Sequence, residues 1–366
     1  MLSYAEYESR LWASAQRHHL PIAGSFELTY RCNFDCVHCF QQDVRDQNEA
    51  STEVWLRLVD QLADAGCLWL TLTGGEAIIH PGFAAIYERA VRRGMLVTVF
   101  SNGSTLSEKI IDLFARLPPR TIEVTMYGAS AETYEKSTGR ARHYDLAIAG
   151  VKRAIAAGFD VHLKTMVFKE TADDFAAMQA LAKELGRPFR YDTSIHATIG
   201  GSHAPTHHRL EPEAIIALEQ RDQQVTDEIL VRHADPKNHG SDQVYRCGAG
   251  RFAFNVAPDG YLQLCTLVRT LRFDLAQTPF SEAWSALGDE VQRRYASSNR
   301  RCNGCDIRHM CGTCPGVAEL ETGDPEGAVD HICETTHLRA SAVLGRTIRP
   351  KWKGEPTRQE RLKVIS

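Results

Sequence analysis

Six apolar runs of strand length alternate with amphipathic helical stretches between about residues 24 and 196. The apolar runs fall at residues 25–30, 68–73, 96–101, 122–127, 161–168 and 189–195. The helical patterns fall at residues 55–65, 82–93, 108–116, 144–157 and 173–185. This alternation predicts an α/β fold, a parallel sheet with its connecting helices outside. Because six repeats are fewer than the eight of a closed barrel, we expect a partial (β/α)6 barrel whose strand ends face the active site.

The bulk properties of the chain exclude several classes of protein. Its 366 residues leave room for more than one domain, and its formal net charge of −4 gives no basic surplus for binding nucleic acid or acidic membranes. No run approaches the roughly 20 apolar residues that span a bilayer. The N-terminus reads as an amphipathic helix and lacks the order of a secretory signal. We therefore expect a cytoplasmic protein with no membrane or nucleic-acid partner.

The chain has eleven cysteines, and most of them are clustered. Three lie within residues 32–39, four lie within residues 302–314, and Cys247, Cys265 and Cys333 surround the second group. The odd total and the missing export signal favour metal ligands over disulfides. Cys67 fits neither group, and we expect it to be a buried small apolar residue.

Cys32, Cys36 and Cys39 form the pattern C-x3-C-x2-C directly after the first predicted strand. Three thiolates can hold three irons of a cubane cluster and leave the fourth iron open to a small molecule. Zinc is the alternative, although structural zinc sites usually take four protein ligands. The pattern resembles the radical S-adenosylmethionine (radical SAM) superfamily. That resemblance implies a 4Fe–4S cluster that cleaves S-adenosylmethionine to a 5′-deoxyadenosyl radical, which abstracts hydrogen from an unactivated carbon.

Gly74, Gly75 and Glu76 end the second predicted strand. They resemble the Gly-Gly-Glu-Pro motif of the same superfamily, with Ala77 in place of proline. The resemblance implies that this segment receives the methionine amino group of S-adenosylmethionine, since glycine permits close backbone approach and a carboxylate suits an ammonium. A strand-ending turn without this role is the alternative.

Other candidate cofactor contacts also rest on the resemblance. It implies that Ser101 and Asn102, after the third strand, meet the methionine or ribose part, with a simple turn as the alternative. It places His38 near the adenine, with a packed loop histidine as the alternative. Lys164 and Thr165 on the fifth strand are further candidates. The sequence identifies no catalytic acid or base, and the first radical step requires none.

The later cysteines have the spacing C-x2-C-x5-C-x2-C at residues 302–314, with Cys333 eighteen residues beyond. Together with Cys247 and Cys265 they resemble the SPASM domain, although the gap before its sixth cysteine is usually three residues. The resemblance implies two auxiliary 4Fe–4S clusters, hence three clusters in all. The outer one would use Cys302, Cys305, Cys311 and Cys333. The inner one would use Cys247, Cys265 and Cys314, with an open iron or a non-cysteine fourth ligand. A pair of structural zinc sites is the alternative.

These patterns together predict five segments of the chain. We expect an N-terminal helix at residues 1–20, the radical SAM partial barrel at residues 21–210 and a linker helix at residues 211–245. The SPASM domain would then occupy residues 246–340. The tail at residues 341–366 carries seven Lys or Arg against two Glu, and we expect it to be an exposed basic arm.

The SPASM resemblance favours a maturase that oxidatively modifies a ribosomally made peptide, by crosslinking or excision. The segment 126–134 also resembles the peptide-modifying branch, and it equally predicts a strand-to-helix turn capped by Ser130. The roughly twenty residues before the first strand are too few for a leader-binding domain, so we expect either a separate leader-binding protein or direct capture of the substrate. The electron donor would be a flavodoxin or ferredoxin. The alternatives are a sulfatase-maturing enzyme, a small-molecule dehydrogenase or epimerase, and a non-catalytic iron–sulfur or zinc protein.

Overall fold

The computed structural model describes residues 3–221, 227–231, 242–298 and 300–350. The chain divides into two compact units. The first comprises Met1–His208 and Cys247–Arg293, and the second comprises Arg209–Arg246 and Arg294–Ser366. Compactness thus groups the segment after Cys247 with the barrel, whereas the cysteine spacing groups it with the later cysteines. The five domain boundaries expected from the sequence stay predictions.

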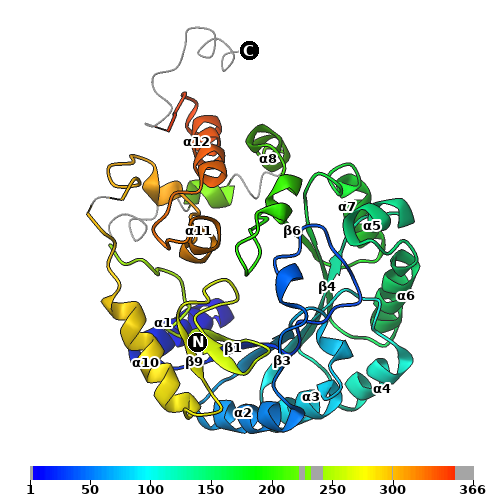
Figure 1. The fold of residues 1–366 in the computed structure, drawn as a ribbon. Coiled ribbons are helices and arrows are strands. Elements are labelled where there is room, and N and C mark those ends of the chain that lie inside the picture. The colour runs from blue at the N-terminus through cyan, green and yellow to red at the C-terminus, as the bar shows by residue number, and fades with distance from the viewer. Residues whose placement is uncertain (1–2, 222–226, 232–241, 299, 351–366) are drawn as a thin grey trace. The chain divides into compact units, whose positions relative to one another are not determined.

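The first unit is built on one curved sheet, which has nine strands within the described residues (Figure 1). Its order is β6-β5-β4-β3-β2-β1-β7-β8-β9. The six expected parallel strands are confirmed as β1 (Ala23–Glu27), β2 (Trp69–Thr73), β3 (Leu96–Ser101), β4 (Thr121–Met126), β5 (Val161–Met166) and β6 (Phe189–Asp192). Three further strands were not predicted from the sequence, namely β7 (Ala253–Val256), β8 (Tyr261–Gln263) and β9 (Arg272–Asp274). Strand β7 pairs parallel to β1, and β8 and β9 continue the sheet in antiparallel order.

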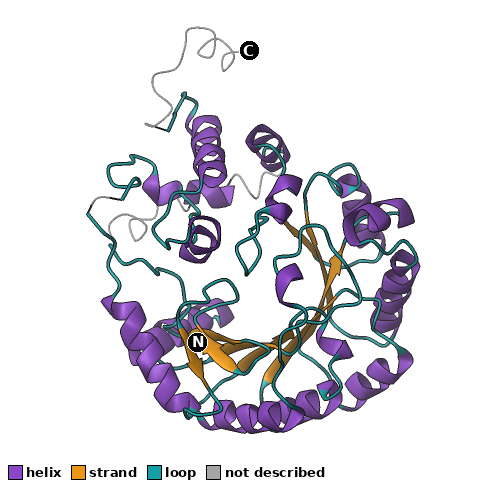
Figure 2. Cartoon of the chain, in the orientation of Figure 1, coloured by secondary structure: helices purple, strands orange, loops and turns teal. Residues whose placement is uncertain are grey.

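Helices cover the outer side of this sheet, and the curved row of strands lies inside them (Figure 2). They are α2 (Thr52–Asp64), α3 (Phe83–Arg92), α4 (Glu108–Arg116), α5 (Ala131–Thr138), α6 (His143–Ala156) and α7 (Phe175–Glu184). In α2 the buried residues Trp55, Leu58, Val59 and Leu62 have the 3.6-residue period of one helix face. Trp55 packs on Phe26 of β1, with ring centroids 4.7 Å apart. The expected (β/α)6 arrangement is therefore confirmed.

Two further helices pack at the β1–β9 side of the first unit. The first, α1 (Tyr4–His18), starts with a capping box between Ser3 and Glu6. The second, α10 (Phe280–Arg293), buries Trp284, whose Nε1 donates to the backbone oxygen of His19 at 2.7 Å. The rings of His19 and Trp284 stack with centroids 4.4 Å apart. These contacts join the end of α1 to α10.

The second unit has α8 (Pro212–Glu219), α11 (Pro315–Thr322) and α12 (Asp330–Leu344). A two-pronged ion pair links α8 and α12, with Arg339 donating to Glu219 at 2.6 and 2.8 Å. The expected linker helix at residues 211–245 falls partly outside the described residues, and so does the tail beyond residue 350. Within the described part, the tail differs from the expected exposed arm. Leu344 and Ile348 pack on a small core that contains Ile307 and Met310.

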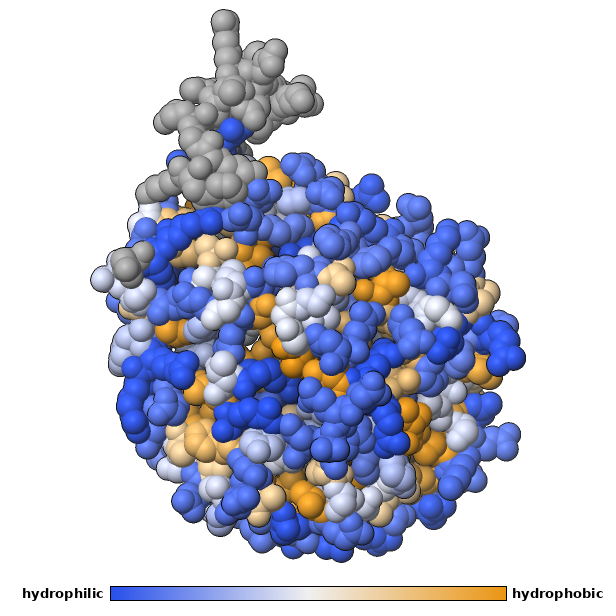
Figure 3. Space-filling view, viewed as in Figure 1, coloured by the Kyte–Doolittle hydropathy of each residue, from blue (hydrophilic) through white to orange (hydrophobic). Residues whose placement is uncertain are grey.

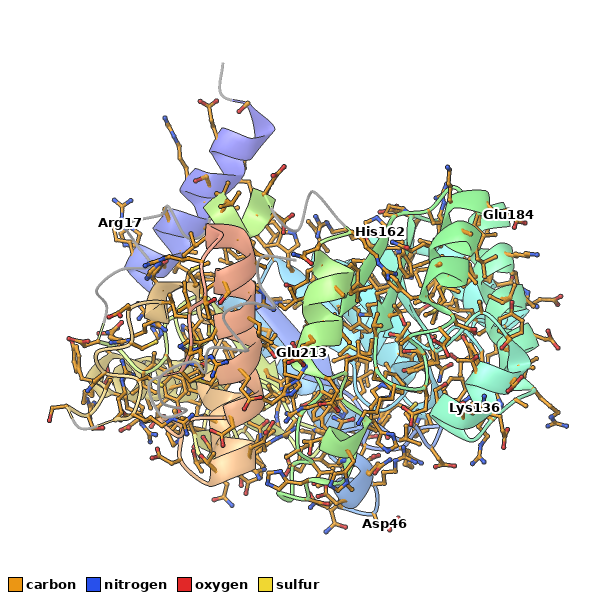
Figure 4. All side chains as sticks on the ribbon, turned by 90° about the horizontal axis from the view of Figure 1, so that it is seen from above. Arg17, Asp46, Lys136, His162, Glu184 and Glu213 are labelled. Carbon is orange, nitrogen blue, oxygen red and sulfur yellow. The ribbon has the colours of Figure 1, made fainter. Side chains whose placement is uncertain are left out.

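Charged side chains such as Lys136 on α5 and Glu184 on α7 point away from the barrel (Figure 4). The face drawn in Figure 3 is largely hydrophilic, with hydrophobic residues in small separate groups. No helix among the described residues is long and apolar enough to cross a membrane.

Candidate active site

Three cysteines line a cavity at the carboxyl ends of the parallel strands. Cys32, Cys36 and Cys39 lie in the loop after β1, and the cavity has a volume of about 560 Å³. That volume is within the roughly 300–1,000 Å³ usual for small-molecule sites. Other strand ends supply Gly74, Gly75, Thr125, Tyr127, Lys164, Thr165, Met166, Tyr191 and Asp192. The cysteines therefore face a space large enough for a small-molecule cofactor or substrate.

Backbone hydrogen bonds and aromatic packing hold this cysteine loop. The N–H of Asp35 donates to the backbone oxygen of Thr138 at 3.0 Å. The N–H of Val37 donates to the backbone oxygen of Ser137, also at 3.0 Å. Both acceptors lie at the end of α5. Phe34 is fully buried and makes edge contacts with the rings of Tyr127 and Tyr134. Ser130 accepts a hydrogen bond from the backbone of α5, so the expected helix cap is confirmed. The loop thus rests on α5 rather than projecting freely.

The donor set suits a metal cluster. Burial raises the pKa of Cys32 to about 11, and burial also raises the pKa of Cys36 and Cys39. Such thiols become ligands when a metal displaces their protons. No three His, Cys, Asp or Glu side chains in the described part of the chain are arranged around a single metal ion. Ligands of a cubane cluster each bind a different iron, so they need not converge on one point.

Gly74 and Gly75 pack against the segment that leads into the cysteine loop. Gly74 has φ +136°, and a Cβ there would lie 2.5 Å from the backbone oxygen of Thr29. A Cβ on Gly75 would lie 2.2 Å from the backbone oxygen of Arg31. The Gly75 N–H donates to Thr29 at 2.8 Å. Glycine is therefore required at both positions to bring β2 beside the loop, whatever else its backbone binds.

Glu76, Ser101 and Asn102 form a buried network behind the cavity lining. Glu76 is 1 % exposed, and its Oε1 accepts hydrogen bonds from Ser101 Oγ at 3.0 Å and Thr105 Oγ1 at 2.9 Å. Its Oε2 accepts from the N–H of Asn102 at 2.7 Å. Burial raises the pKa of the Glu76 carboxyl, although the three hydrogen-bond donors act in the opposite direction. The carboxylate expected to receive the methionine amino group is thus already engaged by the end of β3.

Asn33, which sequence reasoning missed, connects that network to the cysteine loop. Its Oδ1 accepts from Asn102 Nδ2 at 2.7 Å, and its Nδ2 donates to Ser104 Oγ at 2.9 Å. Asn33 directly follows Cys32. A chain of hydrogen bonds therefore runs from Glu76 at the end of β2, through Asn102, to Asn33, the residue next to Cys32. No sequence motif signalled this role.

His38 and Thr165 both line the cavity. The His38 ring lies 4.3 Å from the ring of Phe168, and its Nδ1 is buried with no hydrogen-bond partner among the described residues. Burial lowers the pKa of His38 to about 3, so its imidazole is neutral. Thr165 Oγ1 donates to the backbone oxygen of Met126 at 2.8 Å. His38 thus offers a neutral ring and an unused polar atom at the cavity wall.

Lys164 belongs to a charged group on the inner face of β4, β5 and β6. Its Nζ lies 3.0 Å from Glu123 Oε2 and 3.0 Å from the centroid of the Phe100 ring. Arg190, opposite Lys164 in the strand register, pairs with the same carboxylate. Burial lowers the pKa of Lys164 to about 8. Lys164 and Arg190 therefore line the cavity as two basic groups, and the half-buried Glu123 beside them pairs with both.

A second cavity lies wholly in the second unit. Cys302, Cys305, Cys311 and Cys333 line it, and we call it the C-terminal cysteine pocket. It measures about 70 Å³, well below the roughly 300–1,000 Å³ of sites for drug-sized ligands. Burial raises the pKa of Cys302, and the thiols of Cys311 and Cys333 raise it further, so these groups lie close together. The structure thus gathers the four residues expected to hold the outer cluster, in a space that suits a compact group.

The remaining cysteines have varied surroundings, and all eleven are free thiols. Cys247 is exposed and Cys265 half-buried in the first unit, while Cys314 precedes α11 in the second. The inner ligand set therefore combines residues of both units and stays a prediction. Cys67 is buried as expected, and burial raises its pKa to about 12.

The fold and the cysteine-lined cavity define a class of protein. Residues 26–182 match the family model described as the radical SAM superfamily, a span that includes β1 to β5 and the cysteine loop. Residues 26–182 therefore form a radical SAM domain, and the cofactors of that superfamily are a 4Fe–4S cluster and S-adenosylmethionine. The cysteine-rich C-terminal region resembles the SPASM type.

Known proteins resemble the chain over most of its length. The AdoMet-dependent heme synthase of Methanosarcina barkeri is 24% identical over 338 residues, covering 82% of this chain and 93% of that protein. The mycofactocin maturase MftC of Mycobacterium ulcerans is 28% identical over 331 residues, covering 86% and 88%. The crystal structure of Streptococcus suis SuiB bound to its precursor peptide SuiA has a TM-score of 0.66 at 16% identity, covering 89% and 80%. At this low identity, the similarity to SuiB supports the fold alone.

Proposed function

We propose that this protein is a radical SAM maturase that oxidatively modifies a ribosomally made peptide. The observation that carries the proposal is the cavity where Cys32, Cys36 and Cys39 face the strand ends. The relationship to the mycofactocin maturase supports a peptide substrate. We place the enzyme in the cytoplasm, with a flavodoxin or ferredoxin as electron donor and a separate leader-binding protein.

The cavity residues have defined parts in this proposal. Cys32, Cys36 and Cys39 hold the cluster, and the backbone of Gly74 and Gly75 lines the space for S-adenosylmethionine. When bound, this pair supplies a 5′-deoxyadenosyl radical that abstracts hydrogen. Glu76, Ser101 and Asn102 support the binding segment from behind, and the His38 ring covers one wall. Together the side chains orient the reactants and exclude water.

The later cysteines add two auxiliary clusters in this proposal. Cys302, Cys305, Cys311 and Cys333 hold the outer cluster, and Cys247, Cys265 and Cys314 hold the inner one. The SPASM domain then spans residues 246–340 and the barrel residues 21–210. Three cubane clusters predict about twelve irons per chain after anaerobic reconstitution.

A second candidate is a small-molecule radical SAM enzyme. The specific observation in its favour is the relationship to the heme synthase, which extends over 93% of that protein. Such an enzyme would use the same first step on a different hydrogen donor. The two candidates therefore differ in the substrate that gives up the hydrogen.

Deuterium transfer distinguishes them. The reconstituted enzyme is reduced and incubated with S-adenosylmethionine and a deuterated synthetic copy of a short peptide encoded beside its gene. We expect deuterium in 5′-deoxyadenosine and a mass change in the peptide. A matched reaction with a deuterated porphyrin precursor of heme tests the second candidate. Deuterium-free 5′-deoxyadenosine with every neighbouring peptide, together with turnover of the porphyrin, would overturn the peptide assignment.

A further inference from the structure

Three arginines converge on the C-terminal cysteine pocket. Arg246, Arg300 and Arg308 all line it. The same pocket is lined by the four cysteines expected to hold the outer cluster. Its wall therefore brings three positive charges and four thiols together.

Carboxylates of the described residues do little to compensate this charge. Glu326 also lines the pocket, but its Oε2 accepts hydrogen bonds from the N–H and Oγ of Ser297 at 2.7 and 3.0 Å. Arg308 lies 3.6 Å from the exposed carboxylate of Asp242. Arg246 and Arg300 form no ion pair within the part of the chain that the structure describes. Arg246 and Arg300 thus have no carboxylate partner among the described residues.

Arg300 has the most informative position of the three. Its Nε donates to Asn303 Oδ1 at 2.9 Å, whereas its Nη2 is buried and has no hydrogen-bond partner among the described residues. A buried donor without a partner is unfavourable, so an acceptor is expected beside it. Cys302, two residues further along the chain, lines the same pocket. Arg300 therefore has a free donor beside one of the pocket's cysteines.

We propose that Arg300 supplies charge and a hydrogen-bond donor to the cluster held in the C-terminal cysteine pocket, and thereby raises its reduction potential. This inference rests on the proposed function, because it requires an outer auxiliary cluster. A 4Fe–4S cluster with four thiolate ligands is an anion, and it gains one negative charge when it takes up an electron. Positive charge and N–H donors nearby stabilise that reduced state. The arginines thus suit a cluster that accepts electrons.

The test uses full-length protein in which Cys32, Cys36 and Cys39 are replaced by alanine, so that only auxiliary clusters form. Iron and sulfide are quantified first, and about eight irons per chain are expected for two cubane clusters. Redox titration followed by electron paramagnetic resonance then gives each midpoint potential. A Cys311→Ser variant identifies the signal of the outer cluster.

Arg300→Gln and Arg300→Lys are then compared with Arg346→Gln, an exposed arginine of the same unit. We expect Arg300→Gln to raise the ratio of oxidised to reduced outer cluster about tenfold at a fixed potential, which is a shift of about 59 mV for one electron. The Arg300→Lys and Arg346→Gln proteins should stay near the parent. Loss of outer-cluster iron in Arg300→Gln alone would also support the role.

Two results overturn the inference, and they differ from failure of the proposed function. Eight irons with an unchanged potential in Arg300→Gln would remove the role of Arg300 and leave the clusters intact. Equal loss of iron in the Gln and Lys variants would indicate a structural role only. A parent protein without auxiliary iron would refute the proposed clusters themselves, and the inference with them.

Discussion

Asn102 donates its side-chain amide to Asn33 Oδ1 across 2.7 Å, and this bond ties the end of β3 to the residue that follows Cys32. The backbone N–H of the same Asn102 donates to Glu76. One residue therefore joins the second and third strand ends to the cysteine loop, through its backbone on one side and its side chain on the other. It explains how two short motifs far apart in the sequence act on a single site.

Replacing Asn33 by alanine should loosen the cysteine loop. The change leaves Asn102 Nδ2 without its partner, which costs about 1–3 kcal/mol for a buried donor. We expect the free energy of unfolding of the iron-free protein to fall by this amount. We also expect the cluster to assemble more slowly. Denaturant titration measures the first effect. Asn48→Ala, at an exposed loop position, is the control, and equal stability of the two variants would contradict the assigned role.

Gly75→Ala should prevent the close approach of β2 and the cysteine loop. The added Cβ would lie 2.2 Å from a backbone oxygen, which cannot move as a flexible side chain would. Overpacking of this kind costs about 1–3 kcal/mol, and we expect the first cluster to be lost. Gly312→Ala meets nothing within 4 Å and should unfold like the parent. Thermal unfolding and iron analysis check both variants. A Gly75→Ala protein with the stability and iron content of the parent would show that the neighbouring backbone moves to accept the added Cβ.

Lys164 should make stability depend on alkaline pH. Its pKa of about 8 in the folded protein is below the 10.5 of an exposed lysine, so the unfolded chain binds the proton more tightly. The cost of burying the charge is fully present below pH 8 and disappears as pH rises from 8 to 10.5. Relative to Lys164→Met, the parent should therefore gain about 2 kcal/mol between pH 7 and 9.5.

Lys136→Met is the control for that titration, because Lys136 is exposed on α5 (Figure 4). Urea unfolding of the three proteins at both pH values gives the comparison. A parent that gains no more stability than Lys164→Met over this range would show that Lys164 is not buried in its charged form.

The Arg339–Glu219 pair should matter for the second unit. Its side chains are only 21 % and 13 % exposed, and removing one partner of a buried pair costs about 3–5 kcal/mol. We expect the Arg339→Met protein to lose far more free energy of unfolding than the double variant Arg339→Met, Glu219→Leu. The exposed pair of Arg293 and Asp289 should contribute at most about 1 kcal/mol. Double-mutant cycles on both pairs provide the measurement, and equal couplings would contradict the structure.

Much of the barrel was predictable because short strand-like runs alternate regularly with amphipathic helical patterns. The strand ends were less predictable: the sixth strand was expected to continue to residue 195, but β6 ends at Asp192, and Ser194 and Ile195 line the cavity. Strands β7 to β9 have only three or four residues, too few to show a period. Their place beside β1 depends on tertiary pairing.

The cysteines of the site were predictable because ligand spacing is chemical information carried by the sequence itself. The supporting residues were not. Asn33 and Asn102 meet across 69 residues, and Glu123 meets Lys164 only through the register of β4 and β5. Glu76 was found by its motif, yet its carboxylate is engaged behind the cavity rather than lining it. The arginines of the C-terminal cysteine pocket likewise converge only in the folded chain.

Formation of 5′-deoxyadenosine tests the central claim most directly, namely that the cysteine loop after β1 initiates radical chemistry. The reconstituted protein and its Cys36→Ala variant are each reduced with dithionite in the presence of S-adenosylmethionine, and the nucleoside is quantified by mass spectrometry. We expect 5′-deoxyadenosine from the parent and none above background from the variant. Equal amounts from both proteins, or none from either with every candidate substrate, would contradict it.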